Sequence, residues 1–440
     1  MNITQFTIEE VRCFAERQTF EIRPLTFLVG ENSTGKTTAL ACFQVLADFI
    51  DKGEVNFNPR SYAMGTFGDI VRRSRKPEKS FLLGLSIDVD GENVYLSAEF
   101  IEKANGIEPF IGATAIGFED GYVCFEIRQS AQRERESALR KARANSFNVT
   151  YRSVPSGAFR PFFLLQSFAG GSNTDGMDQE TALAMFLREK LDSNSSLFRL
   201  GVSGNLIALS TAPVRSEPRR TYDPVSELLD PEGSNVPTFL LNLAVSNTAE
   251  WEKLSQQLAA FGKSSGLFSK VSVKNLGDTK SGPFQLKVKV RGPTVSFSDV
   301  GYGVSQIFPI LVNVLAESLV RTRSDANKMP TYHLMQQPEV HLHPKAQAEF
   351  SSLLVRLASQ GGQAFLVETH SDYMVDRARI EIMRGNICKD DVSLIYLEPK
   401  RNVVKAHNIS FDEMGNMIGV PPKFRDFFLR ESSRLMGFED

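Results

Sequence analysis

A glycine-rich loop near the N-terminus has residue types and a spacing that could bind phosphate. In PLTFLVGENSTGKTTALACFQVLADFI, residues 24–50, Gly30, Gly35, Lys36 and Thr37 complete the pattern GxxxxGK[ST]. An apolar, strand-like segment precedes the loop and a segment of helical period follows it, which is the context that the pattern requires. The spacing therefore predicts a phosphate-binding loop rather than a chance combination of glycine and lysine.

Each position of this loop has an expected chemical task. Glycines let the backbone curl so that successive N–H groups point at phosphate oxygens, and the following helix adds the positive end of its dipole. Lys36 would neutralise the β and γ phosphates of a nucleotide, and Thr37 would offer its hydroxyl to Mg²⁺. The predicted nucleotide-binding residues of the loop are Gly30, Asn32, Ser33, Thr34, Gly35, Lys36, Thr37 and Thr38.

A second candidate segment, TYHLMQQPEVHLHP at residues 331–344, has the alternation of a strand followed by a turn and a helix. A phosphate-binding loop needs such a strand to carry acids for the metal and the attacking water. Here the strand ends in Gln336 and Gln337. An amide can hydrogen-bond a metal-bound water, but it can neither supply charge nor act as a general base near neutral pH.

Four motifs in a fixed order give the chain a family resemblance. They are ENSTGKTT in the loop, FSDVGYGVSQIFPIL at 297–311, QQPEVHLHPKAQAEF at 336–350 and FLVETHSDYM at 365–374. Together they resemble the SMC/Rad50-like ABC ATPases, specifically the compact branch related to the overcoming-lysogenization-defect proteins. The motifs lie in the first 50 residues and in the last third of the chain, so the middle is assigned by exclusion.

The resemblance implies an α/β fold, namely an ABC-type ATPase head with a P-loop core sheet, an antiparallel β lobe and an inserted helical lobe. The implied domains are an N-terminal ATPase lobe with the P-loop and β subdomain at 1–129, the helical lobe at 130–250, and a C-terminal ATPase lobe at 251–440. Alternating residues around Asp90-Gly91 independently predict a hairpin in the β lobe. The charged segment 130–146 is far too short for a long coiled coil.

The resemblance also implies ATP and Mg²⁺ as cofactors and assigns roles at the second strand. Gln336 stands at the metal-side acid and Gln337 at the catalytic glutamate, while His370 matches the switch histidine that contacts the γ-phosphate. Gln336 and Thr37 are thus the implied metal residues. Three interpretations stay open: a naturally weak ATPase, an acidic role taken over by Glu339, or a Glu-to-Gln substitution at 336 that traps ATP. The third is favoured, because it is the smallest edit that removes charge and preserves shape.

The glycine-rich segment that precedes the predicted helix 304–319 stands where ABC ATPases carry their signature motif. In that family the motif presents small residues and helix N-terminal amides to the γ-phosphate held by the other subunit. The register leaves open whether Ser298 or Ser305 makes the contact, and a turn that merely caps the helix is the alternative. The signature would require at least a homodimer. Its candidate residues are Ser298, Gly301, Gly303 and Ser305.

Composition limits the remaining possibilities. Lys and Arg total 50 against 52 Asp and Glu, so the net charge of −2 gives no global signal for nucleic acid or membrane. Four isolated cysteines and the lack of a long apolar run predict a soluble, cytoplasmic protein. His341 and His343 could suggest a metal pair, but HLHP follows the second strand in this family. The short basic run at 72–76 is either a solvated loop or a contact with DNA or a partner.

The C-terminal segment leads to two functional hypotheses. Two expected strands, 391–399 and 402–410, and a helix at 421–436 leave no room for the Toprim nuclease of the lysogenization-defect proteins. The chain then resembles the ATPase subunits of two-gene phage-defence systems such as Septu and PARIS. It would be an ATP-gated sensor and scaffold that controls a separate nuclease effector, triggered by DNA or a phage protein. The alternative is a DNA-repair or recombination-mediator ATPase that clamps DNA.

Overall fold

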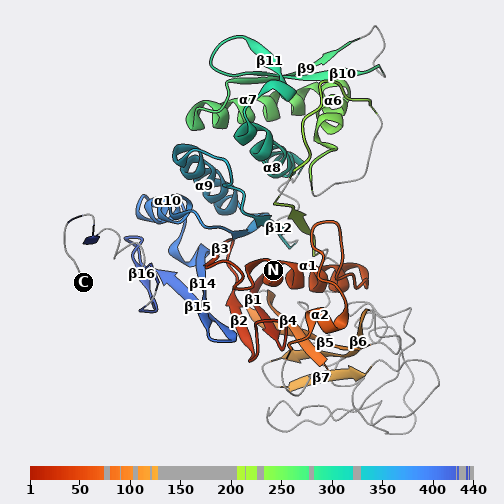
Figure 1. Ribbon diagram of the computed structural model, residues 1–440, viewed down its shortest axis with the longest axis vertical. Coiled ribbons are helices and arrows are strands. Elements are labelled where there is room, and N and C mark those ends of the chain that lie inside the picture. The colour runs from red at the N-terminus through yellow and green to blue at the C-terminus, as the bar shows by residue number, and fades with distance from the viewer. Residues whose placement is uncertain are drawn as a thin grey trace.

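The computed structural model describes residues 1–73, 80–89, 91–102, 108–118, 121–126, 206–213, 215–224, 232–276, 282–320, 329–422, 424–425, 433–434 and 436. These residues form three β-sheets with helices packed against them (Figure 1). The predicted α/β class is therefore confirmed.

The core sheet has seven strands in the order β16-β15-β14-β3-β13-β12-β8. All neighbouring strands from β14 to β8 are parallel, whereas β15 and β16 are antiparallel additions at the other edge. Because parallel strands end at the same edge, the segments that follow β3, β13 and β12 meet there. The strands are β3 (Leu25–Gly30), β8 (Ala208–Thr211), β12 (Thr331–Gln336), β13 (Gln363–Glu368), β14 (Val392–Lys400), β15 (Val403–Phe411) and β16 (Met417–Ile418).

Helices cover both faces of this sheet, because successive side chains of β3 point to opposite faces and each face carries apolar side chains. Leu28 packs into the hydrophobic cluster that includes α1 (Lys36–Lys52). Phe27, on the opposite face, packs into the cluster that includes α9 (Pro344–Ser359) and α10 (Asp372–Met383). Strands β12 and β13 are buried along their whole length, as expected of central parallel strands. The core sheet is thus a rigid platform for the loops at its edge.

The N-terminal β lobe is a six-stranded antiparallel sheet in the order β2-β1-β4-β5-β6-β7 (Figure 1). The hairpin predicted around Asp90-Gly91 is present as β4 and β5, with Gly91 at a φ of 93°. Phe57, Phe81 and Phe100 pack with ring centroids 5.1–5.6 Å apart beneath the sheet, close to the short helix α2 (Phe67–Ile70). The strands are β1 (Asn2–Glu9), β2 (Gln18–Glu21), β4 (Ser80–Val89), β5 (Glu92–Glu102), β6 (Pro109–Phe118) and β7 (Gly121–Glu126).

A third unit lies at the upper end of Figure 1 and combines a three-stranded sheet, β11-β10-β9, with helices α6, α7 and α8. The expected amphipathic helix at Trp251 is part of α7, and α8 begins two residues before the predicted 304. The stretch Tyr302–Leu319 of α8 could cross a membrane by length and composition, but 61% of it is buried inside the protein, as in a core helix. The elements are α6 (Val236–Ser246), α7 (Thr248–Ser265), β9 (Lys270–Asn275), β10 (Phe284–Lys289), β11 (Thr294–Ser296) and α8 (Tyr302–Val320).

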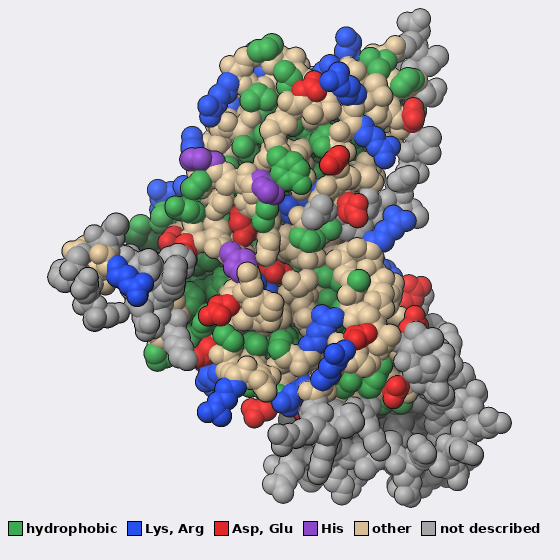
Figure 2. All heavy atoms as spheres, viewed as in Figure 1, with side chains coloured by type: hydrophobic (Ala, Val, Ile, Leu, Met, Phe, Trp, Pro, Cys, Tyr) green, Lys and Arg blue, Asp and Glu red, His purple; other side chains and the backbone are tan. Residues whose placement is uncertain are grey.

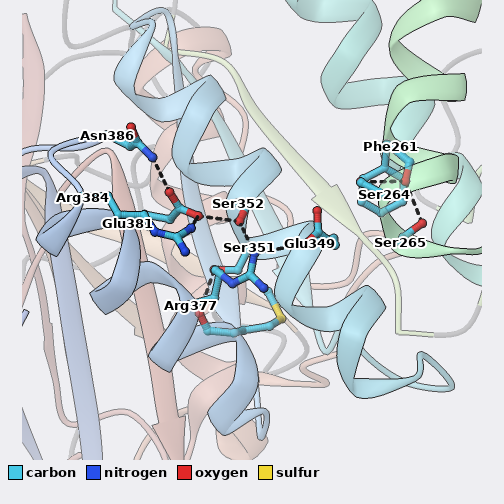
Figure 3. Close-up of polar contacts among 11 residues, drawn as sticks. Phe261, Ser264, Ser265, Glu349, Ser351, Ser352, Arg377, Glu381, Arg384 and Asn386 are labelled. Atoms are coloured by element: carbon cyan, nitrogen blue, oxygen red, sulfur yellow. Dashed lines mark hydrogen bonds and ion pairs between the residues drawn. The ribbon is translucent and has the colours of Figure 1, made fainter.

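Polar side chains tie α9 to α10, the helices that follow β12 and β13 (Figure 3). Glu381 on α10 accepts a hydrogen bond from Ser352 on α9 at 2.8 Å and another from Asn386 at 2.5 Å. Arg377 on α10 donates to Glu349 on α9 at 3.1 Å. These contacts fix the two helices relative to each other, and with them the two loops at the sheet edge.

The domain division remains a prediction, and the structure adds one feature to it. Much of the expected helical lobe at 130–250 lies outside the described residues, including the charged segment 130–146. Within the described part, α6 is helical, but β8 pairs in parallel with β12 and belongs to the core sheet. The expected strands 391–399 and 402–410 are present as β14 and β15, whereas most of the expected helix 421–436 lies outside the described residues.

Candidate functional site

The phosphate loop joins β3 to α1, and its two glycines are required by close contacts. A Cβ atom on Gly30, whose φ is 150°, would lie 2.8 Å from the carbonyl oxygen of Leu397. A Cβ atom on Gly35, whose φ is 89°, would lie 2.6 Å from the Sγ atom of Cys13. Both glycines therefore permit a backbone path that another residue would strain. The helix begins at Lys36, directly after the second glycine.

Lys36 is buried at the base of this loop. Its Nζ atom donates hydrogen bonds to the carbonyl oxygens of Gly30 at 3.0 Å and Glu31 at 2.7 Å. Burial lowers the pKa of the ammonium, while the negative charges of Glu368 and Glu339 act in the opposite direction. The charged group thus lies within the loop that the sequence assigns to phosphates.

The remaining loop residues divide into exposed and buried positions. Asn32, Ser33 and Thr37 are exposed, and Ser33 has a positive φ of 63°. Thr34 is buried and donates to the carbonyl oxygen of Glu31 at 2.9 Å. Thr38 is also buried and accepts a hydrogen bond from Arg12 at 3.2 Å. A ligand bound over the loop could therefore contact the side chains of the exposed residues.

Thr37 makes a contact that the sequence did not predict. Its Oγ1 atom donates a hydrogen bond of 2.8 Å to Oε2 of Glu368, the last residue of β13. Burial raises the pKa of Glu368, and the hydrogen bond from Thr37 and the charge of Lys36 oppose that rise. A signal was present in the sequence, since Glu368 is an acid at the end of an apolar strand, immediately before the predicted switch.

Gln336 lies in register with Glu368 on the neighbouring strand but has different partners. The side chain is buried, and its Nε2 atom donates to the carbonyl oxygen of Ser61 at 3.3 Å. The main-chain carbonyl oxygen of Gln336 accepts a hydrogen bond of 3.3 Å from the guanidinium of the buried Arg215. Because β13 separates β12 from β3, Gln336 is one strand further from the phosphate loop than Glu368 is.

Gln337 begins the turn after β12 and faces Glu368. It has a positive φ of 42°, and its N–H group donates to the carbonyl oxygen of Glu368 at 2.8 Å. A hydrogen bond from its side chain also acts to lower the pKa of the Glu368 carboxyl. The second amide therefore lies beside Glu368, the acid that contacts Thr37 of the phosphate loop, and its predicted catalytic role stays a prediction.

Glu339 connects the same turn to the predicted switch. The residue is 6% exposed, and its Oε1 atom accepts a hydrogen bond of 2.8 Å from the N–H group of His370. Its Oε2 atom is buried without a hydrogen-bond partner, and burial raises the pKa of the carboxyl. His370 itself is exposed, and both its partial burial and the charge of Lys36 lower its pKa.

The signature candidates lie around the start of α8. Gly301 is exposed and accepts the first helical hydrogen bond, from Val304. Ser305 is buried, and its hydroxyl donates to the carbonyl oxygen of Tyr302 at 2.8 Å. Ser298 lies in a 3₁₀ turn before the helix and is partly buried. Its hydroxyl lies 3.1 Å from the hydroxyl of Ser296 and 3.1 Å from the carboxylate of Asp299. Of the two serines, Ser298 is the one closer to solvent.

The turn after β12 also contacts the signature segment. A Cβ atom on Gly303 would lie 2.5 Å from the carbonyl oxygen of His341, and the ring of His341 packs against Tyr302 with centroids 4.5 Å apart. His343 caps α9 by accepting the N–H group of Lys345 at 3.3 Å. Within the described ranges no group of three or more His, Cys, Asp and Glu side chains could hold a metal on its own.

The structure thus brings most predicted residues together in two groups. Lys36, Thr37, Gln337 and His370 converge at the sheet edge with two acids, Glu368 and Glu339, and Gln336 lies behind them. The signature candidates form the second group, and the hydroxyl hydrogen bonds of Ser298 and Ser305 within the described residues stay inside 296–305.

Comparison with known proteins adds a family match. A family model described as AAA ATPase domain matches residues 224–375, less than half of the chain but including the signature candidates, β12 and the switch. No curated protein matches the sequence.

Among solved structures, similar chains are SMC head domains. The SMC head bound to the C-winged helix domain of ScpA is 10% identical, with a TM-score of 0.49, and the match covers 94% of this chain and 99% of that one. The SMC head domain from Thermotoga maritima is 10% identical, with a TM-score of 0.39 and coverage of 92% and 98%. The Smc head domain with an extended coiled coil, bound to the C-terminal domain of ScpA derived from Pyrococcus furiosus, is 12% identical, with a TM-score of 0.44 and coverage of 93% and 96%. The family match and the loop geometry together support an ATP-binding ATPase domain.

Proposed function

We propose that this protein binds ATP with Mg²⁺ at the edge of the core sheet and uses the nucleotide to join two copies of the chain. The observation that carries the proposal is the hydrogen bond between Thr37 and Glu368, next to the buried ammonium of Lys36. This contact places the hydroxyl of Thr37, which would bind the metal, next to a carboxylate and within the phosphate loop.

The residues present fit a nucleotide-bound magnesium ion. Mg²⁺ in nucleotide sites takes one or two carboxylates together with phosphate oxygens and water, so it needs no cage of protein ligands. Two buried carboxylates lie near Lys36, and one of them has an oxygen without a hydrogen-bond partner. Thr37 and a carboxylate of the sheet edge would hold the ion, which when bound neutralises charge on the β and γ phosphates.

The signature segment supports a site shared between two protomers. Gly301 is exposed, and a Cβ atom there would meet nothing within 4 Å, so the start of α8 is open to a ligand from outside its own chain. Helix N-termini attract phosphate through their N–H groups and dipole. ATP bound to the loop of one protomer would thus contact α8 of its partner, giving at least a homodimer.

The test is the mass of the protein in solution, measured by light scattering with ATP and Mg²⁺, with ADP and Mg²⁺, and without nucleotide. We expect a dimer or larger assembly with ATP only. A mass that is unchanged by ATP, while ATP binding is confirmed separately, would contradict the shared site.

The finer function that we propose is a sensor and scaffold that controls a separate nuclease in bacterial phage defence, acting in the cytoplasm. Its support is the resemblance of the four sequence motifs to the compact ATPase branch and to the Septu and PARIS subunits. A nuclease gene beside this one, whose product co-purifies with the chain in an ATP-dependent manner, is the expected finding. A nuclease that does not associate with the ATP-bound chain would contradict it.

A clamp on DNA is the second candidate, and one surface favours it. The outward face of β9 and β10 carries Lys270, Lys274, Lys287 and Lys289, and these two strands contain no acid. Lys270 lies directly opposite Lys289, a pairing that repels and therefore costs stability unless an anion is near. Figure 2 shows acidic and basic side chains interspersed over the face in view.

DNA binding through this face would depend on salt. Replacing Lys270 and Lys289 by Gln should lower the slope of log affinity against log salt by about 2, since each phosphate contact contributes about 0.9. Replacing Lys52 and Lys345, which lie on other elements, is the matched control. An unchanged slope in the first variant would exclude this face from DNA binding.

A further inference from the structure

We propose that Glu368, at the end of β13, is the carboxylate that holds Mg²⁺ together with Thr37, so that the metal-side acid lies one strand away from its expected place at Gln336. This assignment rests on the proposed binding of ATP with Mg²⁺. It identifies the protein ligand for the metal at that site.

Strand order is the first argument. Strand β13 lies between β3, which leads into the phosphate loop, and β12, which ends in Gln336. The last residue of β13 is therefore closer to the loop, and Glu368 already contacts the hydroxyl of Thr37 at 2.8 Å. A cation that is bound by this hydroxyl and by a phosphate oxygen would have the Glu368 carboxylate as its neighbour.

The contacts of Gln336 are the second argument. Its Nε2 atom donates to the carbonyl oxygen of Ser61, and only the nitrogen of an amide can serve as this donor. A carboxylate at position 336 would place its oxygen against the carbonyl oxygen of Ser61, so that two hydrogen-bond acceptors would face each other in a buried environment. The amide therefore belongs to the packing around Ser61. The hydrogen bond that it makes requires an N–H donor and not a negative charge.

Glu339 is the competing acid, and its contacts assign it a different task. One oxygen accepts the N–H group of His370, so the side chain holds the turn after β13 in place. Its second oxygen is buried without a hydrogen-bond partner, and its charge acts on both Lys36 and Glu368. Buried cations oppose both carboxylates, because the charge of Lys36 acts on Glu368 and the charge of the buried Arg215 acts on Glu339. The hydroxyl of Thr37 is hydrogen-bonded to Glu368, and this contact favours Glu368 as the metal ligand.

The test compares nucleotide binding with and without metal. Binding of a fluorescent ATP analogue is measured in Mg²⁺ and in EDTA, and the binding of Mn²⁺ is followed by the loss of its free electron paramagnetic resonance signal. The variants are Glu368→Gln, which keeps an acceptor for Thr37 but removes the charge, and Glu339→Gln. Glu349→Gln, on α9 and away from the loop, is the control for the loss of a partly buried carboxylate.

The wild-type protein and Glu349→Gln should bind the analogue more tightly in Mg²⁺ than in EDTA. Glu368→Gln should lose this difference and bind Mn²⁺ at least about tenfold more weakly. Its affinity in EDTA should be no lower than that of the wild type, because a negative charge beside the phosphates is removed, and such binding shows that the variant is folded. Glu339→Gln should keep most of the difference. A full metal effect in Glu368→Gln, or a loss in Glu339→Gln as large as in Glu368→Gln, would overturn the assignment. Failure of the wild-type protein to bind ATP in either buffer would overturn the proposed function as well.

Discussion

Gln336 shows how the partners of one side chain bear on its role. In the sequence the amide stands where an acid is usual, and this favours an ATP-trapping substitution. In the structure the amide nitrogen donates to the carbonyl oxygen of Ser61, a contact that glutamate cannot make. This contact favours an amide that belongs to the native packing, with the acid supplied by Glu368. Impaired hydrolysis stays a prediction.

Gln336→Glu tests this interpretation. The substitution should lower the free energy of unfolding by about 1–3 kcal/mol, because it leaves buried acceptors facing each other. It should not restore ATP turnover. Urea unfolding measures the first effect and phosphate release measures the second. Gln363→Glu is the control, since Gln363 is also buried and its Nε2 atom donates to the carbonyl oxygen of Val314. Turnover that rises sharply at unchanged stability would instead show that the amide at position 336 traps ATP.

Lys36→Met should abolish ATP binding without unfolding the protein. The ammonium donates to two carbonyl oxygens of its own loop, and Met retains the length and apolar character of the buried stem. Lys52→Met is the matched control, since Lys52 lies at the other end of α1 and pairs with Asp48. Calorimetric titration with ATP distinguishes the two variants. Equal ATP affinity in both would contradict the assignment of the loop.

At the scale of the elements, the turn after β12 is the junction of the site. It carries Gln337 beside the phosphate loop, Glu339 against the switch and His341 against the start of α8. Helices α9 and α10, which follow β12 and β13, are held together by the ion pair between Arg377 and Glu349 and by the hydrogen bond from Ser352 to Glu381. A shift of α8 would therefore be transmitted to this turn through direct contact.

Gly303→Ala and Gly301→Ala compare a tightly packed glycine with an exposed one. The first places a Cβ atom 2.5 Å from the carbonyl oxygen of His341 and should cost about 1–3 kcal/mol in unfolding free energy. The second places its Cβ atom in open space, so stability should stay within about 0.5 kcal/mol. Thermal unfolding of the two variants provides the comparison. Equal stability would show that α8 and the turn are not tightly packed.

At the scale of the whole molecule, a shared site predicts complementation between defective chains. Lys36→Met removes the phosphate loop function of one protomer, and Gly301→Arg obstructs the signature of another. A mixed dimer of the two retains one intact site, made from the unaltered loop of one chain and the unaltered signature of the other.

The mixture should bind ATP and associate more than either variant alone. Light scattering with ATP and Mg²⁺ measures the association, and a mixture of Lys36→Met with wild-type protein calibrates it. If the mixture behaves as the sum of the two separate variants, each site is complete within one chain and the shared site is excluded.

The amino-acid sequence by itself determined the local features of this protein. The glycine spacing, apolar strand and following helix specify the phosphate loop, and the alternation around Asp90-Gly91 specifies the hairpin, because such signals act between residues close in the chain. The central strand at 331–336 was likewise predicted, from the alternation of TYHLMQQ.

Only the tertiary structure decided which acid faces the loop. The contact between Thr37 and Glu368 depends on β13 lying between β3 and β12, and strand order is a product of packing over hundreds of residues rather than of local pattern. The same holds for β8, whose place beside β12 in the core sheet could not be read from residues 208–211 alone. It also holds for Ser305, since its burial inside α8 depends on how that helix packs against the core.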